Sequence, residues 1–464
     1  MSEDPATQNR TVPFPRVSDD ATAPPPLAGT GTARPSRLSA GVRGAARRLS
    51  WGVVDQAASS VTNLVVGIVV ARSLGVDAFG AFGLALVTYA VVLNLSRGLC
   101  TDPLTVRFSG TAHGPWRDAT RQAAGSALVV GIAAGLLCLA AGVLLGGAAG
   151  RAFVALGIVL PALLLQDSWR YAFFAAGRGA SATLNDLVWG VMLVPALLLA
   201  SHRAGVGGFV LGWGAAAAVA ALTGCLQLRL LPAGPRAVLG WLRNQLDLGL
   251  RYMLENTMVS GAAQLRLYGL GAIAGLAAVG SIRGAQLLLG PFMALLMGVS
   301  LVSVPEAARV LSRSRHRLLP FCLVLGGGQA VAGALWGAAI LLLVSEAVGR
   351  RLLGDVWPSA VALLVPTTLV VMAGSFSDGA MAGLRALGAA RRSLFSQTNA
   401  ACAYLALGLG GAALGGAMGS AWGVALATAF SAAVAWYQLR SELHHHRPHG
   451  PSRPRRRPEK ASQP

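Results

Sequence analysis

The stretch that decides the fold is SWGVVDQAASSVTNLVVGIVVARSLGVDAFG, residues 50–80. Positions 51–71 are apolar enough to cross a bilayer as one helix, since about 20 residues span the hydrocarbon core. Asp55 and Gln56 interrupt this run near its start, and Asn63 interrupts it near its middle. A charge in hydrocarbon is costly, so such residues face a partner or a cavity. The stretch therefore predicts a first membrane span that carries a packing or functional role.

Apolar runs of this kind recur along most of the chain. Its 464 residues are 54% hydrophobic and 12% charged, with a mean hydropathy of +0.59, whereas soluble domains carry about 25% charged residues. We therefore expect an all-α polytopic membrane protein and no enzyme. The five cysteines form no CxxC pair and the histidines no HExxH motif, so neither a metal nor a cofactor is expected.

The runs predict about twelve transmembrane helices, with Gly, Pro or charge in the connections. Their expected ranges are 50–72, 79–99, 119–147, 151–175, 182–201, 205–230, 248–273, 276–306, 319–347, 356–385, 394–412 and 416–440. With the N-terminus inside, the inner loops hold fifteen arginines and the outer loops five. This bias predicts that both termini are cytoplasmic and that the protein lies in the plasma membrane.

The same layout divides the chain into five parts. They are a disordered cytoplasmic tail (1–48), a six-helix lobe (49–230), a cytoplasmic amphipathic linker (231–247), a second six-helix lobe (248–440) and a basic tail (441–464). The first tail is rich in Pro, Thr and Ser and cannot bury a core. Basic tails beside a membrane favour anionic lipids as partners, and no nucleic acid is expected.

The second half of the chain repeats features of the first. Gly75 pairs with Gly275 and Gly80 with Gly280 at an offset of 200, and DQAASS aligns with ENTMVS at the same offset. Asp167 pairs with Asp378 at an offset of 211. Two six-helix repeats cross the membrane in the same direction, around a pseudo-twofold axis along the membrane normal. Such a pair of bundles suits alternating access.

The opening residues resemble a known family. The polar pair in the first helix, ARSLGVDAFGAF at the outer turn and RGLCTDPL after the second helix are similar to bacterial polysaccharide transporters of the O-antigen flippase-like group. The two-lobed layout is similar to their wider superfamily, which includes lipid II flippases and multidrug and toxin extrusion antiporters. The resemblance implies two lobes around a central cavity and a lipid-linked oligosaccharide as substrate, with polysaccharide-assembly proteins as candidate partners.

One departure bears on the substrate. The lipid II flippases carry an arginine-rich first helix, whereas Arg72 is the only arginine in or beside this one. Lipid II is therefore not supported as the substrate.

The gating or coupling candidates are polar residues in the first, second and seventh spans, namely Asp55, Gln56, Asn63, Arg97, Arg251 and Glu255. Asp55 and Arg97 have similar expected depths, so they either pair to fix the packing or form an inner gate or protonatable site. Arg251 and Glu255 are four residues apart and can pair on one helix face. Asp167, Arg170, Asp378 and Arg385 are expected to pair within their lobes near the cytoplasmic face.

Arg266 and Arg283 are the candidate substrate-binding residues. They have similar expected depths in the outer half of the membrane, and no acidic residue of their helices lies near that level. An arginine fork binds phosphate oxygens in pairs, so an anion site for a lipid pyrophosphate is one interpretation. The other is that both side chains extend to the outer surface.

Two other functions remain open. A cation-coupled antiporter of small molecules would centre on one membrane carboxylate, and Asp55 is a candidate for it. A membrane-embedded sugar polymerase or ligase would need a large outer loop. The longest outer loop, near positions 346–355, has only about ten residues, close to an ordinary connection, so this function ranks third.

Overall fold

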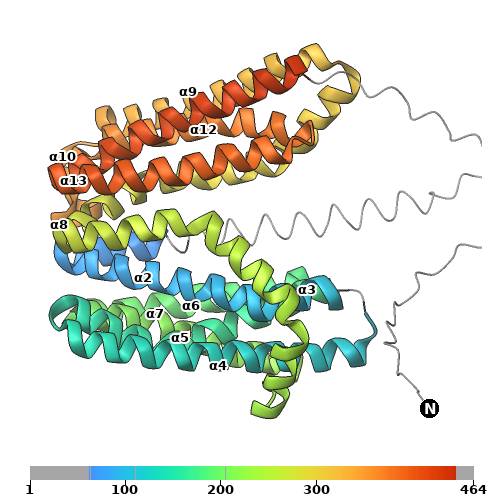
Figure 1. Ribbon diagram of the computed structural model, residues 1–464. Coiled ribbons are helices and arrows are strands. Elements are labelled where there is room, and N and C mark those ends of the chain that lie inside the picture. The colour runs from blue at the N-terminus through green and yellow to red at the C-terminus, as the bar shows by residue number, and fades with distance from the viewer. Residues whose placement is uncertain (1–61, 63, 110, 204, 446–464) are drawn as a thin grey trace, which may run out of the picture. The chain divides into compact units, whose positions relative to one another are not determined.

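Every regular element in the described residues is a helix, as the apolar runs predict. The structure is a computed structural model that describes residues 62, 64–109, 111–203 and 205–445. The elements in chain order are α2 (Val76–Ser96), η1 (Arg97–Thr101), α3 (Asp102–Phe108), α4 (His113–Leu145), α5 (Gly147–Ala175), α6 (Gly179–Arg203), α7 (Gly205–Leu228), α8 (Pro235–Arg313), η2 (Arg315–Arg317), α9 (Leu318–Leu343), α10 (Glu346–Leu353), η3 (Gly354–Val356), α11 (Trp357–Ala362), α12 (Leu364–Ala386) and α13 (Ala390–His445) (Figure 1).

Two of these helices each contain two spans. The apolar part of α8, Ser260–Arg313, has 54 residues, which would extend about 80 Å, whereas a hydrocarbon core is roughly 30 Å thick. The chain turns back at Gly275, whose φ of +82° is readily adopted only by glycine. In α13 the turn falls at Gly415 and Gly416, which also leave the helical conformation.

The described spans agree with the predicted layout. Eight helices in this part of the chain are long and apolar enough to cross a membrane, or nine if the bent pair formed by α10–α12 is one span. Counting the turns inside α8 and α13, these helices correspond to the second to twelfth predicted spans. The first predicted span, 50–72, lies mostly outside the described residues, where only the short apolar helix Leu64–Ser73 represents it.

One predicted span is broken in the structure. The sequence predicted one helix over 356–385, but the chain bends by 72° between α11 and α12. Pro366 explains the break, because it cannot donate to the carbonyl of Ala362 and its ring opposes a continuous helix. The segment predicted as an amphipathic linker, 231–247, is largely helical, since α8 begins at Pro235 and continues into the next span; its cytoplasmic location remains a prediction.

The helices pack in two groups. In the N-terminal bundle, α4 packs on α5, and α5 and α6 pack on α7. In the C-terminal bundle, which comprises α8 from Ser260 onward together with α9–α13, α9 and α13 pack on α12 and α13 packs on α8 (Figure 1). Each bundle contains six of the predicted spans once the first one, outside the described residues, is assigned to the N-terminal group.

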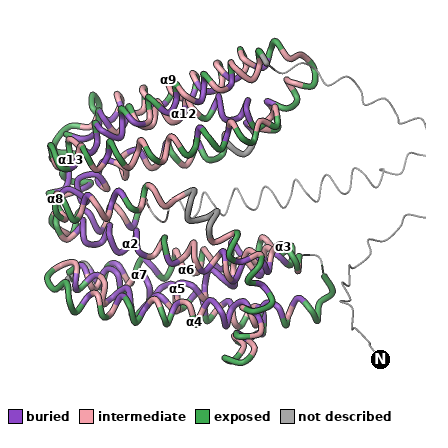
Figure 2. The backbone as a smooth tube through the Cα atoms, viewed as in Figure 1, coloured by how far each residue is buried: buried purple, intermediate pink, exposed green. Residues whose placement is uncertain are grey.

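The outer surfaces of the bundles are apolar. In α4 the exposed side includes Leu137, 73% exposed, and Leu144, 86% exposed. Helix α5, by contrast, is buried along much of its length (Figure 2). Water would penalise such an exposed leucine face, whereas lipid solvates it at no cost. The exposure pattern therefore fits a protein embedded in a bilayer.

The two ends of the helices differ in composition. Helix α3 and the connections between α5 and α6, between α7 and α8 and between η2 and α9 lie at one end, and α10 lies at the other (Figure 1). We call the first the basic end; its loops and helix ends carry Arg107, Arg117, Arg121, Arg178, Arg229, Arg236, Arg313, Arg317 and Arg391. We call the second the glycine end; its turns contain Gly146, Gly275, Gly354 and Gly416, all with positive φ.

At the glycine end, α2 and α8 touch through their backbones. A Cβ atom added to Gly80 would lie 1.9 Å from the carbonyl oxygen of Leu276, and one added to Gly280 would lie 2.2 Å from that of Val76. Only glycine allows helices this close. Gly80 and Gly280 are the two residues that the offset of 200 aligns, so the contact is symmetric with respect to the repeat.

Polar contacts continue this interface toward the basic end. The hydroxyl groups of Thr88 and Tyr268 lie 2.7 Å apart, and the Asn94 side-chain amide donates to the Ser260 hydroxyl at 2.7 Å. Gly98 lies against the backbone of Met253. Apolar side chains add to these contacts, since Leu84 and Val87 of α2 belong to one buried cluster with Leu267, Leu270, Val279 and Ile282 of α8.

Candidate functional site

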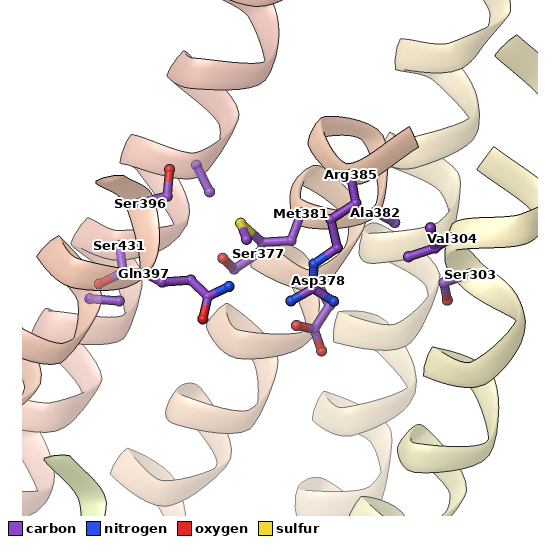
Figure 3. Close-up of a pocket in the computed structure, with 12 residues that line it drawn as sticks. Ser303, Val304, Ser377, Asp378, Met381, Ala382, Arg385, Ser396, Gln397 and Ser431 are labelled. Carbon is purple, nitrogen blue, oxygen red and sulfur yellow. The ribbon is translucent and has the colours of Figure 1, made fainter. Parts of the chain in front are cut away.

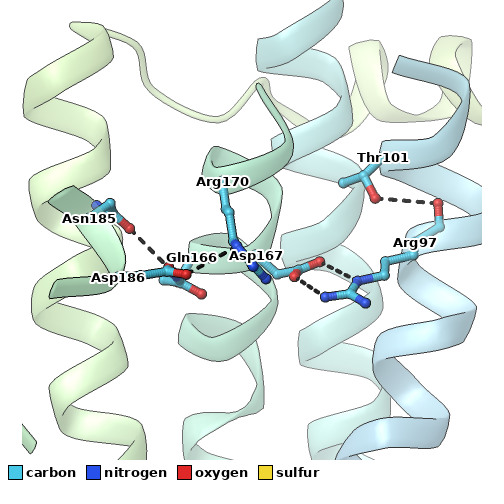
Figure 4. A network of polar contacts seen from close by, with 7 residues as sticks. All are labelled: Arg97, Thr101, Gln166, Asp167, Arg170, Asn185 and Asp186. Atoms are coloured by element: carbon cyan, nitrogen blue, oxygen red, sulfur yellow. Dashed lines mark hydrogen bonds and ion pairs between the residues drawn. The ribbon is translucent and has the colours of Figure 1, made fainter. Parts of the chain in front are cut away.

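A buried polar network occupies the N-terminal bundle (Figure 4). The Arg97 guanidinium donates to both carboxylate oxygens of Asp167, at 3.0 Å and 2.6 Å. It also lies 5.1 Å from the centre of the Tyr171 ring. Arg97 begins the π-helical turn η1, where α2 widens; such turns are frequent at functional sites. A bidentate pair of this kind is strong and directional.

A second pair lies beside the first. The Arg170 Nε lies 3.1 Å from an Asp186 carboxylate oxygen, and the Gln166 side-chain amide donates to Asp186 at 2.9 Å. Asn185 donates to the carbonyl oxygen of Ala220 on α7 at 2.8 Å. Two arginines and two aspartates give the network no net charge. Its described contacts tie η1, α5, α6 and α7 together.

The sequence predicted pairing within the lobes but did not identify the partners. Asp167 does pair within its bundle, but with Arg97 on η1, and Arg170, three residues away, pairs with Asp186. Residues three apart on a helix are neighbours, yet the long arginine side chains reach carboxylates on facing helices. Asp186 had not been singled out, because a lone carboxylate near the start of a span carries no signal of its partner.

Several coupling candidates cannot be located. Asp55, Gln56 and Asn63 lie outside the described residues, so both interpretations of Asp55, a pair with Arg97 and an inner gate or protonatable site, remain untested. Arg251 is exposed on α8, and the side chain of Glu255 also lies outside the described part. The predicted Arg251–Glu255 contact therefore remains a prediction.

Arg266 lies inside the C-terminal bundle and is only 2% exposed. One of its terminal nitrogens donates to the Ser420 hydroxyl at 3.0 Å, and its guanidinium lies 5.2 Å from the centre of the Tyr404 ring. Gly408 makes room for it, since a Cβ there would lie 2.7 Å from the arginine Cδ. Its buried Nε has no hydrogen-bond partner among the described residues.

Arg283 lies where the two bundles meet. A Cβ added to Gly83 of α2 would lie 3.0 Å from the arginine Cγ, so this glycine leaves space for the side chain. The Nε of Arg283 is also buried, with no hydrogen-bond partner in the described part of the chain. Arg266 and Arg283 lie within electrostatic range of each other, with Tyr404 near both.

These positions refine the predicted anion site. Arg283 borders the N-terminal bundle, but Arg266 points into its own bundle instead of standing free between the two. Tyr404 and Ser420, which contact Arg266, come from the two arms of α13, about 140 to 150 positions away in sequence. No hydropathy pattern pairs such distant residues, so the sequence could not identify them.

A polar pocket lies in the C-terminal bundle near the basic end (Figure 3). Its cavity measures about 240 Å³ and is lined by residues of α8, α12 and α13, including Ser303, Asp378, Arg385, Gln397 and Ser431. The Arg385 side chain points toward the Asp378 carboxylate (Figure 3). Both residues line the pocket, but among the described residues Asp378 forms no ion pair within 4.0 Å, so the expected pairing of Asp378 and Arg385 remains a prediction.

Metal binding has no candidate cluster in the described ranges. No group of three or more His, Cys, Asp or Glu side chains there could hold an ion. The nucleophile candidates are equally sparse, since Cys100, Cys138 and Cys322 are buried among apolar residues.

Comparison with known proteins identifies the fold. No protein-family model and no curated protein matches the chain. A solved structure of an inward-facing multidrug resistance MATE family transporter of the MOP superfamily has a TM-score of 0.61 and 16% identity, over 83% of this chain and 94% of that one. Lipid II flippase MurJ in an inward closed conformation has a TM-score of 0.64 and 9% identity, over 84% and 87%. The chain therefore has the multi-span, all-helical fold that this MATE transporter and MurJ share.

Proposed function

We propose that the chain is an alternating-access transporter that moves a lipid-linked oligosaccharide across the plasma membrane. The observation that carries the proposal is the pair Arg266 and Arg283, two arginines in electrostatic range with unpartnered buried Nε groups among the described residues. The shared fold with MATE and MurJ structures supports transport rather than enzymatic catalysis.

Charge favours an anion at these arginines. A buried guanidinium without an anionic partner costs several kcal/mol, and two of them near each other add repulsion. A pyrophosphate between the sugar and its lipid carrier would offset both costs, because its oxygens accept paired N–H donors. Tyr404 and Ser420 hold Arg266 in a fixed geometry, so part of the ordering cost of binding is already met.

The repeat supports alternating access. Gly80 and Gly280 bring α2 and α8 together at the glycine end, and both similar solved structures are described as inward forms. If α2 and α8 separate at the glycine end while the basic ends of the two bundles approach each other, the protein opens at the glycine end. The arginines concentrated at the basic end support a cytoplasmic location for that end by the positive-inside rule, in line with the expectation that both termini are cytoplasmic.

A flipping assay tests this function. Purified protein in proteoliposomes should expose a pyrophosphate-linked oligosaccharide lipid to an impermeant glycosidase. Arg266→Ala and Arg283→Ala should each lower the initial rate about tenfold or more, since a hydrogen bond to a charged group contributes about 1.5–3 kcal/mol. Replacement by Lys should also impair flipping, because the fork is lost. Arg351→Ala, at an exposed position, is the control. Unchanged flipping in the double alanine variant would exclude the arginine site.

A cation-coupled antiporter is the second candidate, and the pocket at Asp378 favours it. A carboxylate in a cavity of about 240 Å³ with no described ion pair can exchange a proton or a cation. In that case Asp378→Asn should abolish the dependence of transport on an ion gradient, while the alanine variants of Arg266 and Arg283 transport normally. The two functions therefore predict opposite outcomes for the same set of variants.

A further inference from the structure

The first turns of α8 present two unlike faces. We call residues 235–250 the linker helix, since this first part of α8 joins the last span of the N-terminal bundle to the span that begins at Ser260. Val238, Trp241, Gln245 and Gly249 are buried, and their spacing of three and four residues puts them on one face. Trp241 is 2% exposed and packs near the Phe108 ring, with centroids 5.8 Å apart. This face fixes the helix to the N-terminal bundle.

Arg107 of α3 adds polar contacts to the same attachment. Its guanidinium donates to the Asp247 carboxylate at 2.8 Å, to the Gln245 side-chain oxygen and to the Asn244 carbonyl oxygen at 3.2 Å. The linker helix is therefore held by both apolar and polar contacts, and its orientation is defined. Its outer face is consequently a fixed feature of the surface.

The outer face carries Arg236, Leu239, Arg243, Leu246 and Leu250, again at helical spacing. The leucines are 56%, 43% and 44% exposed. Three exposed leucines in one stripe would be unfavourable in water, and arginines beside them are typical of a helix at a membrane interface. The long arginine stems can cover apolar surface while the charged groups reach the headgroups.

The position of the helix fits the same partner. Helix α7 ends at Leu228 and the next apolar span begins at Ser260, so the linker helix is held near the membrane surface at both ends. It crosses the direction of α4–α7 steeply instead of running parallel to them (Figure 1). A helix that crosses the spans at their basic end lies roughly in the plane of the bilayer.

We propose that this outer face binds anionic phospholipids of the leaflet at the basic end. Leu239, Leu246 and Leu250 enter the border of the acyl chains, and Arg236 and Arg243 contact phosphate groups. The site is separate from the transport residues, so the proposal does not depend on the identity of the substrate. Because the other face of the helix is fixed to the N-terminal bundle, bound lipid anchors this bundle while the C-terminal bundle moves.

Spin-label accessibility tests the proposal on the full chain in nanodiscs. Labels replace Leu239 or Leu246, and a label at exposed Asn244, off the stripe, is the control; Cys402→Ser and Cys225→Ser remove the more accessible native thiols. In discs with phosphatidylcholine and phosphatidylglycerol, the first two labels should collide with oxygen and be shielded from a water-soluble nickel chelate. The Asn244 label should collide with the chelate. Equal chelate access at all three positions would overturn membrane contact.

A second comparison tests the charge requirement. Removing phosphatidylglycerol should raise the chelate access of the Leu239 label, and Arg236→Gln/Arg243→Gln should abolish that lipid dependence. Arg313→Gln/Arg317→Gln removes the same charge elsewhere at the basic end and should leave the dependence intact. Access that is independent of phosphatidylglycerol in the parent chain overturns anionic recognition. Dipolar broadening between labels would instead mean that a second copy covers the face, and this also contradicts the proposal.

Discussion

The contact between Gly80 and Gly280 makes a quantitative prediction about conformational change. In Gly80→Ala the new Cβ would lie 1.9 Å from the Leu276 carbonyl oxygen, whereas ordinary contact begins at 3.4 Å. The two backbones must therefore separate locally by the difference, about 1.5 Å. Overpacking that cannot relax costs about 1–3 kcal/mol. If this contact closes one transport state, the substitution shifts the balance toward separated helices about 5- to 150-fold.

Double electron–electron resonance measures this shift. Asp77 and Ala277 are exposed, adjacent to the contact and aligned by the repeat, so labels at these positions report the separation of α2 and α8. Gly80→Ala should enlarge the population with long distances, and Gly280→Ala should act alike because its Cβ would lie 2.2 Å from Val76.

Gly75→Ala is the matched control for this experiment. A Cβ at Gly75 meets nothing within 4 Å, so its distance distribution should equal that of the parent chain. Identical distance distributions in Gly80→Ala and Gly75→Ala, with both proteins folded, would refute the idea that the contact between Gly80 and Gly280 closes one transport state. A shift in the control as large as that in Gly80→Ala would refute it too, since the cause would not be the contact.

Two further predictions concern the packing of the N-terminal bundle. Asp167→Asn leaves Arg97 without its charged partner and should destabilise the protein by about 3–5 kcal/mol, seen as a lower unfolding temperature in detergent; Arg97→Met/Asp167→Leu should recover much of the loss, and a double variant no better than Asp167→Asn would contradict the pairing. The hydrogen bond from Arg107 holds the pKa of the Asp247 carboxyl below its ordinary value. Its stabilising contribution is therefore present above the ordinary pKa, about 3.9, and is lost as the pH falls through the lowered one. Amide exchange in residues 236–248, corrected for intrinsic pH dependence, should be constant from neutral pH to about 4 and accelerate below, whereas Asp247→Asn should exchange fast throughout.

The sequence predicted the spans better than the contacts. Hydropathy and the glycine and arginine separators place eleven of the twelve predicted spans close to described helical segments, because a bilayer imposes a minimum apolar length. The alignment of Gly80 with Gly280 indicates only a repeat, and the structure adds that the two residues meet where α2 and α8 touch. The break before α12 was missed, although Pro366 marks it.

Side-chain partners could not be predicted in the same way. Which carboxylate Arg97 meets depends on the rotation of α5 about its own axis, and hydropathy leaves that rotation undefined in a bundle surrounded by lipid. Hydropathy indicated the depth of Arg266 but no direction, and in the structure its side chain points toward Tyr404 and Ser420, where Gly408 leaves room for it. The direction of the Arg266 side chain therefore depends on the small residue beside it, Gly408, which neither charge nor expected depth could predict.

The most direct test of the central claim is binding of a short-chain polyprenyl pyrophosphate to the purified protein, measured by isothermal titration calorimetry. The account predicts binding that weakens about tenfold or more in Arg266→Ala and in Arg283→Ala, with the uncharged polyprenol binding much more weakly to the parent chain. Arg351→Ala should bind like the parent. Equal affinity of the parent and the double alanine variant for the pyrophosphate would contradict the claim that these two arginines form the substrate site.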